Sequence, residues 1–308
     1  SKFNTMKKLL SILIIAAFSF AAIAQNIQKA RFVDGELSGP YSVIVVSDKA
    51  MPNHTIYRPI DLNAAVKAEG AKLPVLIYGN GACHNVTNEC DVMLAEFASH
   101  GYIVIGVGPL ATQSDIEAMF RNRANMPSTS AEDLVNGLNL MEKVAADPKS
   151  DYYEMIDLTK VAVGGYSCGG AQAMTVSADP RITTTLMMNS GIPNRAFVAP
   201  AAADGQAPAA TPATNSMAIT KDALKQLPGP IIYVVGGPSD VAYENAVDDF
   251  KRIDNVFTVL ASYPVGHGGT YRERFGGAFG NIGLQWLDWQ LKGKAEKGKL
   301  FINDDFQN

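Results

Sequence analysis

The stretch Gly165-Tyr166-Ser167-Cys168-Gly169 follows the apolar run 161–163, and the small pair Gly170-Ala171 comes directly after it. A serine in this setting is typical of a nucleophile elbow, a strained turn from strand to helix that raises the serine hydroxyl above the sheet edge. The flanking glycines are needed because side chains would clash where the backbone turns so sharply. Ser167 is therefore the candidate nucleophile.

A serine nucleophile on such an elbow needs an acid and then a histidine further along the chain. The chain has four histidines, and only His267 lies downstream of Ser167. It stands between glycines just after the strand-like run 256–263, which suits a loop that carries an imidazole over the sheet edge. We predict that His267 is the general base.

Two strand-like runs precede His267, at 231–235 and at 256–263. The acid is expected in the loop after the first of them. Asp240 follows the β-branched run 231–235, and open α/β sheets place functional groups at the carboxyl ends of their strands. Its role would be to hold the His267 tautomer and to stabilise the imidazolium. Glu244, on the helix expected over 241–251, is the competing candidate.

An oxyanion hole needs two backbone amides. The first candidate is the amide of Cys168, at the start of the elbow helix. The second is the amide of Ala82, with Cys83 as its alternative, because the run 73–78 leads into a loop whose glycines allow close approach to the elbow. A phosphate-binding loop is disfavoured, since the segment lacks a Gly-Lys-Ser/Thr ending.

Two further residues are candidates for substrate binding because they lie next to these groups in the sequence. Asn80 belongs to the oxyanion loop, and Tyr271 follows the histidine. The scattered histidines and the lack of paired histidine or cysteine spacing predict no metal site.

These motifs resemble those of a secreted branch of the α/β-hydrolases that includes dienelactone hydrolases and polyester hydrolases. Besides the elbow, the resemblance rests on residues 94–104, 236–246 and 264–271, and it covers nearly all of the chain after residue 24. It implies the α/β-hydrolase fold, a triad of Ser167, Asp240 and His267, no cofactor, and hydrolysis of carboxylic esters. The chain departs from this branch at Ala82, where an aromatic residue is frequent, and at Cys168, where methionine is common.

Apolar strand-like runs alternate with helix-like segments along the chain. This alternation predicts one α/β domain over 25–308, with a mostly parallel central sheet and helices on both faces. The Ala- and Pro-rich segment 196–215 interrupts it as a lid or a surface insertion, and the Lys-rich stretch 292–299 is expected to be a solvated tail. The main strands expected are 41–46, 54–57, 73–78, 102–107, 182–188, 231–235 and 256–263, and the main helices 88–100, 131–146, 241–251 and 279–291.

Residues 1–24 read as upstream residues and a signal peptide. Met6-Lys7-Lys8 provides the charged start, 9–20 the apolar core, and Ala22-Ile23-Ala24 the cleavage pattern. We predict cleavage after Ala24 and a secreted or periplasmic protein. The apolar run is too short to favour a permanent membrane span.

Charge and cysteine usage narrow the function further. The net charge of −4 argues against a nucleic-acid partner, which normally requires a basic surface. An exported protein can form disulfides, and the three cysteines leave Cys83–Cys168, Cys83–Cys90 or three free thiols open.

The sequence thus predicts an exported serine hydrolase that cleaves carboxylic esters, either small molecules or polymer-linked, through an acyl-enzyme. A serine peptidase or amidase would use the same triad. A non-catalytic binding module at the cell envelope is the alternative from another class. The presence of all three triad residues favours an enzyme.

Overall fold

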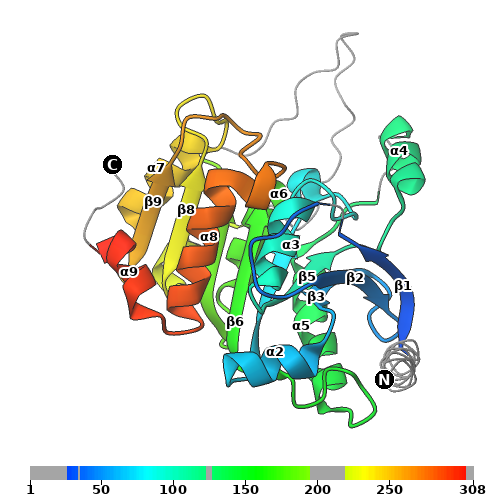
Figure 1. Ribbon diagram of the computed structural model, residues 1–308. Coiled ribbons are helices and arrows are strands. Elements are labelled where there is room, and N and C mark those ends of the chain that lie inside the picture. Colours follow the sequence, from blue (N-terminus) through cyan, green and yellow to red (C-terminus); the bar gives the residue numbers. More distant parts are fainter. Residues whose placement is uncertain (1–25, 34, 123–126, 195–218, 303–308) are drawn as a thin grey trace, which may run out of the picture.

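The computed structural model describes residues 26–33, 35–122, 127–194 and 219–302. The described residues form one nine-stranded sheet in the order β1-β2-β3-β5-β4-β6-β7-β8-β9 (Figure 1). Strand β1 pairs with β2, β2 with β3 and β3 with β5, and all three pairings are antiparallel. From β5 to β9 every pairing is parallel, which confirms the expected mostly parallel sheet.

The bounds of the elements are as follows. The strands are β1 (Ile27–Phe32), β2 (Val43–Asp48), β3 (His54–Pro59), β4 (Leu73–Gly79), β5 (Ile103–Val107), β6 (Ile156–Tyr166), β7 (Ile182–Met188), β8 (Ile231–Val235) and β9 (Thr258–Ser262). The α-helices are α2 (Leu62–Glu69), α3 (Asp91–Ser99), α4 (Gln113–Arg121), α5 (Ala131–Ala146), α6 (Cys168–Val176), α7 (Tyr243–Arg252), α8 (Gly277–Gln290) and α9 (Ala295–Ile302). Short 3-10 turns are η1 (Gly81–Cys83), η4 (Lys221–Gln226) and η5 (Arg274–Gly276).

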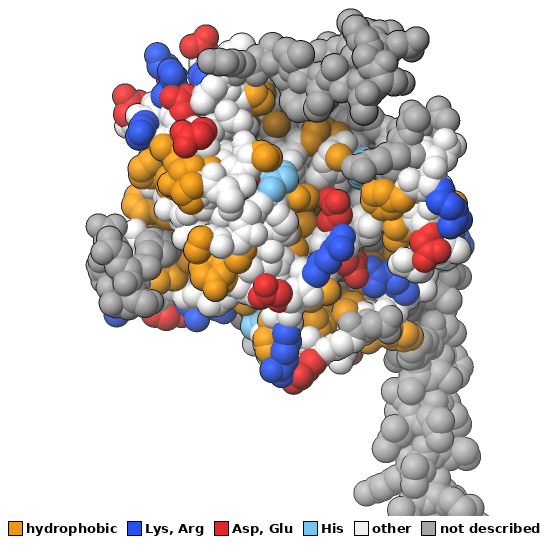
Figure 2. Space-filling model, turned by 90° about the horizontal axis from the view of Figure 1, so that it is seen from above, with side chains coloured by type: hydrophobic (Ala, Val, Ile, Leu, Met, Phe, Trp, Pro, Cys, Tyr) orange, Lys and Arg blue, Asp and Glu red, His pale blue; other side chains and the backbone are white. Residues whose placement is uncertain are grey.

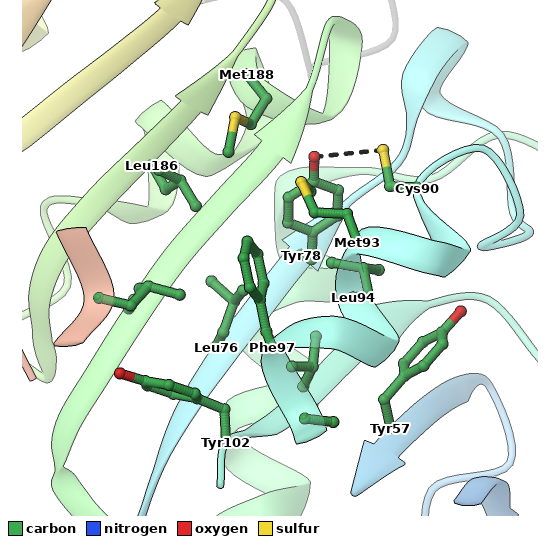
Figure 3. Close-up of a cluster of buried hydrophobic side chains, with 14 of the residues drawn as sticks. Tyr57, Leu76, Tyr78, Cys90, Met93, Leu94, Phe97, Tyr102, Leu186 and Met188 are labelled. Atoms are coloured by element: carbon green, nitrogen blue, oxygen red, sulfur yellow. Dashed lines mark hydrogen bonds between the residues drawn. The ribbon is translucent and has the colours of Figure 1, made fainter. Parts of the chain in front are cut away.

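Helices cover both faces of the sheet. Leu76 and Tyr78 of β4 point to the face covered by α3 and α8, whereas Val75 and Ile77 point to the face covered by α5 and α6. Figure 3 shows the first of these clusters, with Phe97 of α3 packed among side chains of β4 and β7. Strands buried on both faces must be apolar throughout, which is why they appear in the sequence as continuous runs.

Several expected elements differ from those observed. The helix expected from residue 88 begins at Asp91, because residues 89–90 form a turn. Strand β1 and helices α2 and α4 were not predicted from the sequence. Helix α4 is capped by Thr112, whose side chain accepts a hydrogen bond from the amide of Asp115.

The prediction of a solvated Lys-rich tail is wrong. Residues 295–302 form α9, and the side chain of Lys292 is only 9% exposed. Its Nζ lies 2.9 Å from Glu69 Oε2 and donates to the carbonyl oxygen of His100 at 2.6 Å. In this stretch lysines alternate with acidic and small residues, a pattern that shows little sign of a helix. The helix packs against α8.

Two predictions concern segments outside the described residues: the signal peptide over 1–24 and the insertion over 196–215. Among the described helices, none combines the length and the apolar character that a membrane crossing requires.

Candidate active site

Ser167 lies between the last residue of β6 and the first residue of α6, at the edge of the sheet where the parallel strands end. Its backbone has φ 54° and ψ −118°, a conformation that L residues rarely adopt. A Cβ atom on Gly165 would lie 2.3 Å from the backbone of Gly169, and one on Gly169 would lie 2.1 Å from that of Gly79. Both glycines are therefore required by the close approach of the elbow to its neighbours.

His267 is in the loop that follows β9 and contacts Ser167 directly. Its Nε2 lies 2.9 Å from Ser167 Oγ, and its side chain is 28% exposed. The hydroxyl of Tyr166 donates to the carbonyl oxygen of His267 at 3.0 Å. This bond links the histidine loop to the end of β6. Figure 2 looks down on this edge of the sheet and shows a histidine at the surface among hydrophobic side chains, with acidic and basic side chains to one side.

Asp240, rather than the competing Glu244, is the carboxylate that contacts the histidine. Asp240 Oδ1 lies 2.6 Å from His267 Nδ1 and also accepts from the amide of Ala242. Its Oδ2 accepts from the amide of Gly236 at 2.9 Å and from Asn189 Nδ2 at 2.6 Å. Burial alone would raise the pKa of Asp240, but the bonds from His267 and the other donors lower it to about 2.

No protein-family model and no curated protein matches the sequence. Solved structures do match, among them the crystal structure of the dienelactone hydrolase from Anabaena variabilis ATCC 29413. The alignment has a TM-score of 0.50 and covers 85% of this chain and 98% of that chain, at 14% sequence identity. The chain has the α/β-hydrolase fold. At this identity the likeness concerns the fold alone.

A disulfide joins the loop after β4, which carries the oxyanion candidate Ala82, to the elbow. It links Cys83 of η1 to Cys168 of α6 across 85 residues of sequence, so the first of the three cysteine arrangements is the one observed. Cys90 is free and buried, and the Tyr78 hydroxyl donates to its sulfur at 3.5 Å (Figure 3).

The oxyanion candidates lie on the two segments that this disulfide joins. Cys168 is the first residue of α6, where backbone amides have no intrahelical partner. The amide of Cys83, the alternative in the loop, donates to the carbonyl oxygen of Asn80 at 3.2 Å. Ala82 is exposed and has a left-handed φ of 50°, so its amide stays the candidate from this loop.

The two residues predicted to bind substrate are buried and make internal hydrogen bonds. Asn80 is buried, and its Nδ2 donates to the carbonyl oxygens of His84 and Val107, which ties the oxyanion loop to the end of β5. Tyr271 is only 2% exposed, and its hydroxyl donates to Asn189 Oδ1. Nearness in the sequence placed both residues at the site without showing which way their side chains point.

Asn189 is the site residue that sequence reasoning missed. It follows the last residue of β7 and contacts Asp240 because β7 and β8 are neighbours in the sheet. Pairing between strands so far apart in sequence leaves no local signal, and Asn189-Ser190-Gly191 reads only as a turn.

The described part of the chain contains no group of three or more His, Cys, Asp or Glu side chains placed to hold a metal ion.

Proposed function

We propose that this protein is a serine hydrolase that cleaves carboxylic esters through an acyl-enzyme. The observation that carries the proposal is the unbroken hydrogen-bonded path from Ser167 Oγ through both nitrogens of His267 to the buried carboxylate of Asp240. A nucleophile, a base and an orienting acid within hydrogen-bonding distance are the requirements for nucleophilic catalysis by serine.

In the acylation step, His267 Nε2 takes the proton of Ser167 as Oγ forms a bond to the ester carbonyl carbon. The carbonyl π electrons move to oxygen, and the amides of Ala82 and Cys168 donate to the resulting oxyanion. Asp240 stays ionised and stabilises the imidazolium, as its lowered pKa favours. The imidazolium then gives its proton to the alcohol oxygen as the bond from carbon to that oxygen breaks.

Water completes the cycle. His267 takes a proton from a water molecule whose oxygen attacks the acyl carbon, and the second oxyanion is held by the same two amides. When this intermediate collapses, the proton returns to Ser167 Oγ and the carboxylic acid is released. No cofactor enters either step.

The proposed substrates are short acyl or aromatic esters, either as small molecules or as acyl groups on a polymer such as a polysaccharide.

We also propose that the protein is exported. The disulfide between Cys83 and Cys168 supports this, because disulfides persist in oxidising compartments outside the cytosol.

The test is hydrolysis of p-nitrophenyl acetate, butyrate and octanoate by residues 25–308, together with labelling by a fluorophosphonate probe. Ser167→Ala should lose both activities. Ser177→Ala is the matched control, because it removes a hydroxyl at the C-terminal end of the same helix, where Ser177 Oγ donates to the carbonyl oxygen of Met174. Its rate and labelling should equal those of the wild type.

The outcomes separate the alternatives. Labelling of Ser167 without ester hydrolysis, but with release of an amine from amide substrates, would favour a peptidase or amidase. A folded wild type that neither hydrolyses esters nor reacts with the probe would overturn the proposal and favour a binding module.

A further inference from the structure

The side chain of Asn189 lies where the acid loop and the histidine loop meet. Its Nδ2 is 2.6 Å from Asp240 Oδ2 and 3.2 Å from the carbonyl oxygen of Gly266, the residue before the histidine. Its Oδ1 accepts the hydroxyl proton of Tyr271. The Asn189 side chain therefore contacts the acid, Gly266 before the histidine and Tyr271 after it. It is fully buried.

The chemistry of the partners determines the orientation of this amide. Asp240 Oδ2 and the Gly266 carbonyl oxygen are acceptors, so the NH₂ group must face them. Tyr271 supplies the donor on the other side, because burial raises the pKa of its hydroxyl far above the ordinary value of 10.0 and keeps it protonated. The bond to Asp240 is charge-assisted, since the carboxylate is ionised.

The backbone also fixes Asn189 in place. Its φ is 43°, in the left-handed region that asparagine tolerates better than most side chains. Its amide donates to the carbonyl oxygen of Val234 at 2.8 Å, which ties it to the strand that precedes the Asp240 loop. The residue is thus anchored to β8 through its main chain and to the two functional loops through its side chain.

We propose that Asn189 and Tyr271 are positioning residues that hold the Asp240 carboxylate and the His267 loop in line with Ser167. The inference rests on the proposed function. Asn189 donates, together with the Gly236 amide, to the carboxylate oxygen that does not face His267, and it is the only side chain of the described residues to do so, which helps to fix the rotation of the carboxyl group. Tyr271 polarises the Asn189 amide, and its ring packs against that of Tyr166 at 5.1 Å between centroids, on the other support of the histidine loop.

This arrangement predicts the direction of a pH effect. The Asn189 N–H draws negative charge toward Oδ2, away from the oxygen that faces the imidazole. Without this N–H, the carboxylate stabilises the imidazolium more strongly. A higher pH is then needed before the imidazole is neutral and can act as the base. The acid limb of kcat/KM against pH should therefore move to higher pH, while the plateau falls because the carboxylate is less well oriented.

The experiment compares wild type, Asn189→Ala, Tyr271→Phe and Tyr102→Phe by pH profiles of ester hydrolysis and by thermal melting. Tyr102→Phe is the matched control, because like Tyr271→Phe it removes a buried hydroxyl that donates to a side-chain oxygen, here Asp288 Oδ1 at 2.7 Å, at the opposite end of the sheet. For Asn189→Ala we expect the acid limb to rise by roughly half a pH unit and the plateau to fall about tenfold. For Tyr271→Phe both changes should be smaller, and for Tyr102→Phe the profile should stay in place.

Folded Asn189→Ala and Tyr271→Phe proteins with the wild-type acid limb would overturn the proposal, whatever their melting temperatures. If Asn189→Ala does not fold, Tyr271→Phe decides, since it keeps the buried ring and loses one oxygen. If the wild type hydrolyses no ester, the proposed function fails separately. The midpoint of the His267 ring titration, followed by NMR in wild type and Tyr271→Phe, then replaces the rate profile: a rise supports the proposal and an equal midpoint overturns it.

Discussion

Ser167 combines backbone strain with the chemistry proposed for it. A non-glycine residue at φ 54° costs of the order of 1–3 kcal/mol and persists only where its surroundings enforce it. Here the enforcement comes from the carbonyl oxygen of Met188, which accepts the Ser167 amide at 2.9 Å, and from the glycines that let the elbow approach β4. The strained turn holds Oγ 2.9 Å from His267 Nε2.

Asp240 links the site to acid stability. Its pKa is about 2 in the folded protein and about 3.9 in an unfolded chain, so its ionised form stabilises the fold by roughly 2 kcal/mol. Because the folded value is the lower one, this stabilisation is complete well above pH 4 and is lost as the pH falls toward 2. Urea unfolding of wild type and Asp240→Asn should show a difference in free energy of unfolding that shrinks by about 1 kcal/mol between pH 6 and pH 3. An unchanged difference would contradict the prediction.

At the scale of elements, the disulfide joins the two segments that carry the amides proposed for the oxyanion hole. The turn η1 lies after β4 and the helix α6 after β6, and a single covalent link spans the gap between them. The amides proposed for the oxyanion, those of Ala82 and Cys168, stand on either side of that link.

We predict that Cys83→Ser combined with Cys168→Ser lowers the free energy of unfolding by about 4 kcal/mol, because the unfolded chain regains the entropy of a loop of 85 residues. Urea denaturation measures this loss. Adding dithiothreitol should destabilise wild type and Cys90→Ala equally and leave the double variant unchanged, since Cys90 is a free thiol. A double variant as stable as the wild type would show that the link contributes little.

Some elements were predicted from the sequence and others were not. The parallel strands were predicted because burial on both faces demands apolar runs, and Ser167 and His267 because their motif and their order leave few choices. Strand β1 was missed since its residues are mostly exposed at the sheet edge, and α4 since none of its residues is buried. The positions of Asn189 and Tyr271 depend on which strands become neighbours, and that is a property of the whole sheet.

At the scale of the whole molecule, three buried clusters share the same strands. Strands β4 and β6 to β8 contribute side chains to clusters on both faces, so neither face can lose its packing without exposing the other. We therefore expect the described strands and helices to unfold as one cooperative unit.

The two tryptophans provide a test of this expectation, because both belong to α8, with 5.6 Å between their ring centroids. Trp286 and Trp289 of α8 contact Phe301 of α9 at 5.2 Å and 5.7 Å between ring centroids. Fluorescence therefore reports the C-terminal helices, whereas far-UV circular dichroism reports all elements. The two urea transitions should coincide in wild type and in Phe301→Ala, with the variant destabilised by about 3 kcal/mol because it leaves a cavity beside a fully buried tryptophan. A fluorescence transition that precedes the dichroism transition would instead make α8 and α9 a separate unfolding unit, and Phe301→Ala would then widen the gap between the two midpoints.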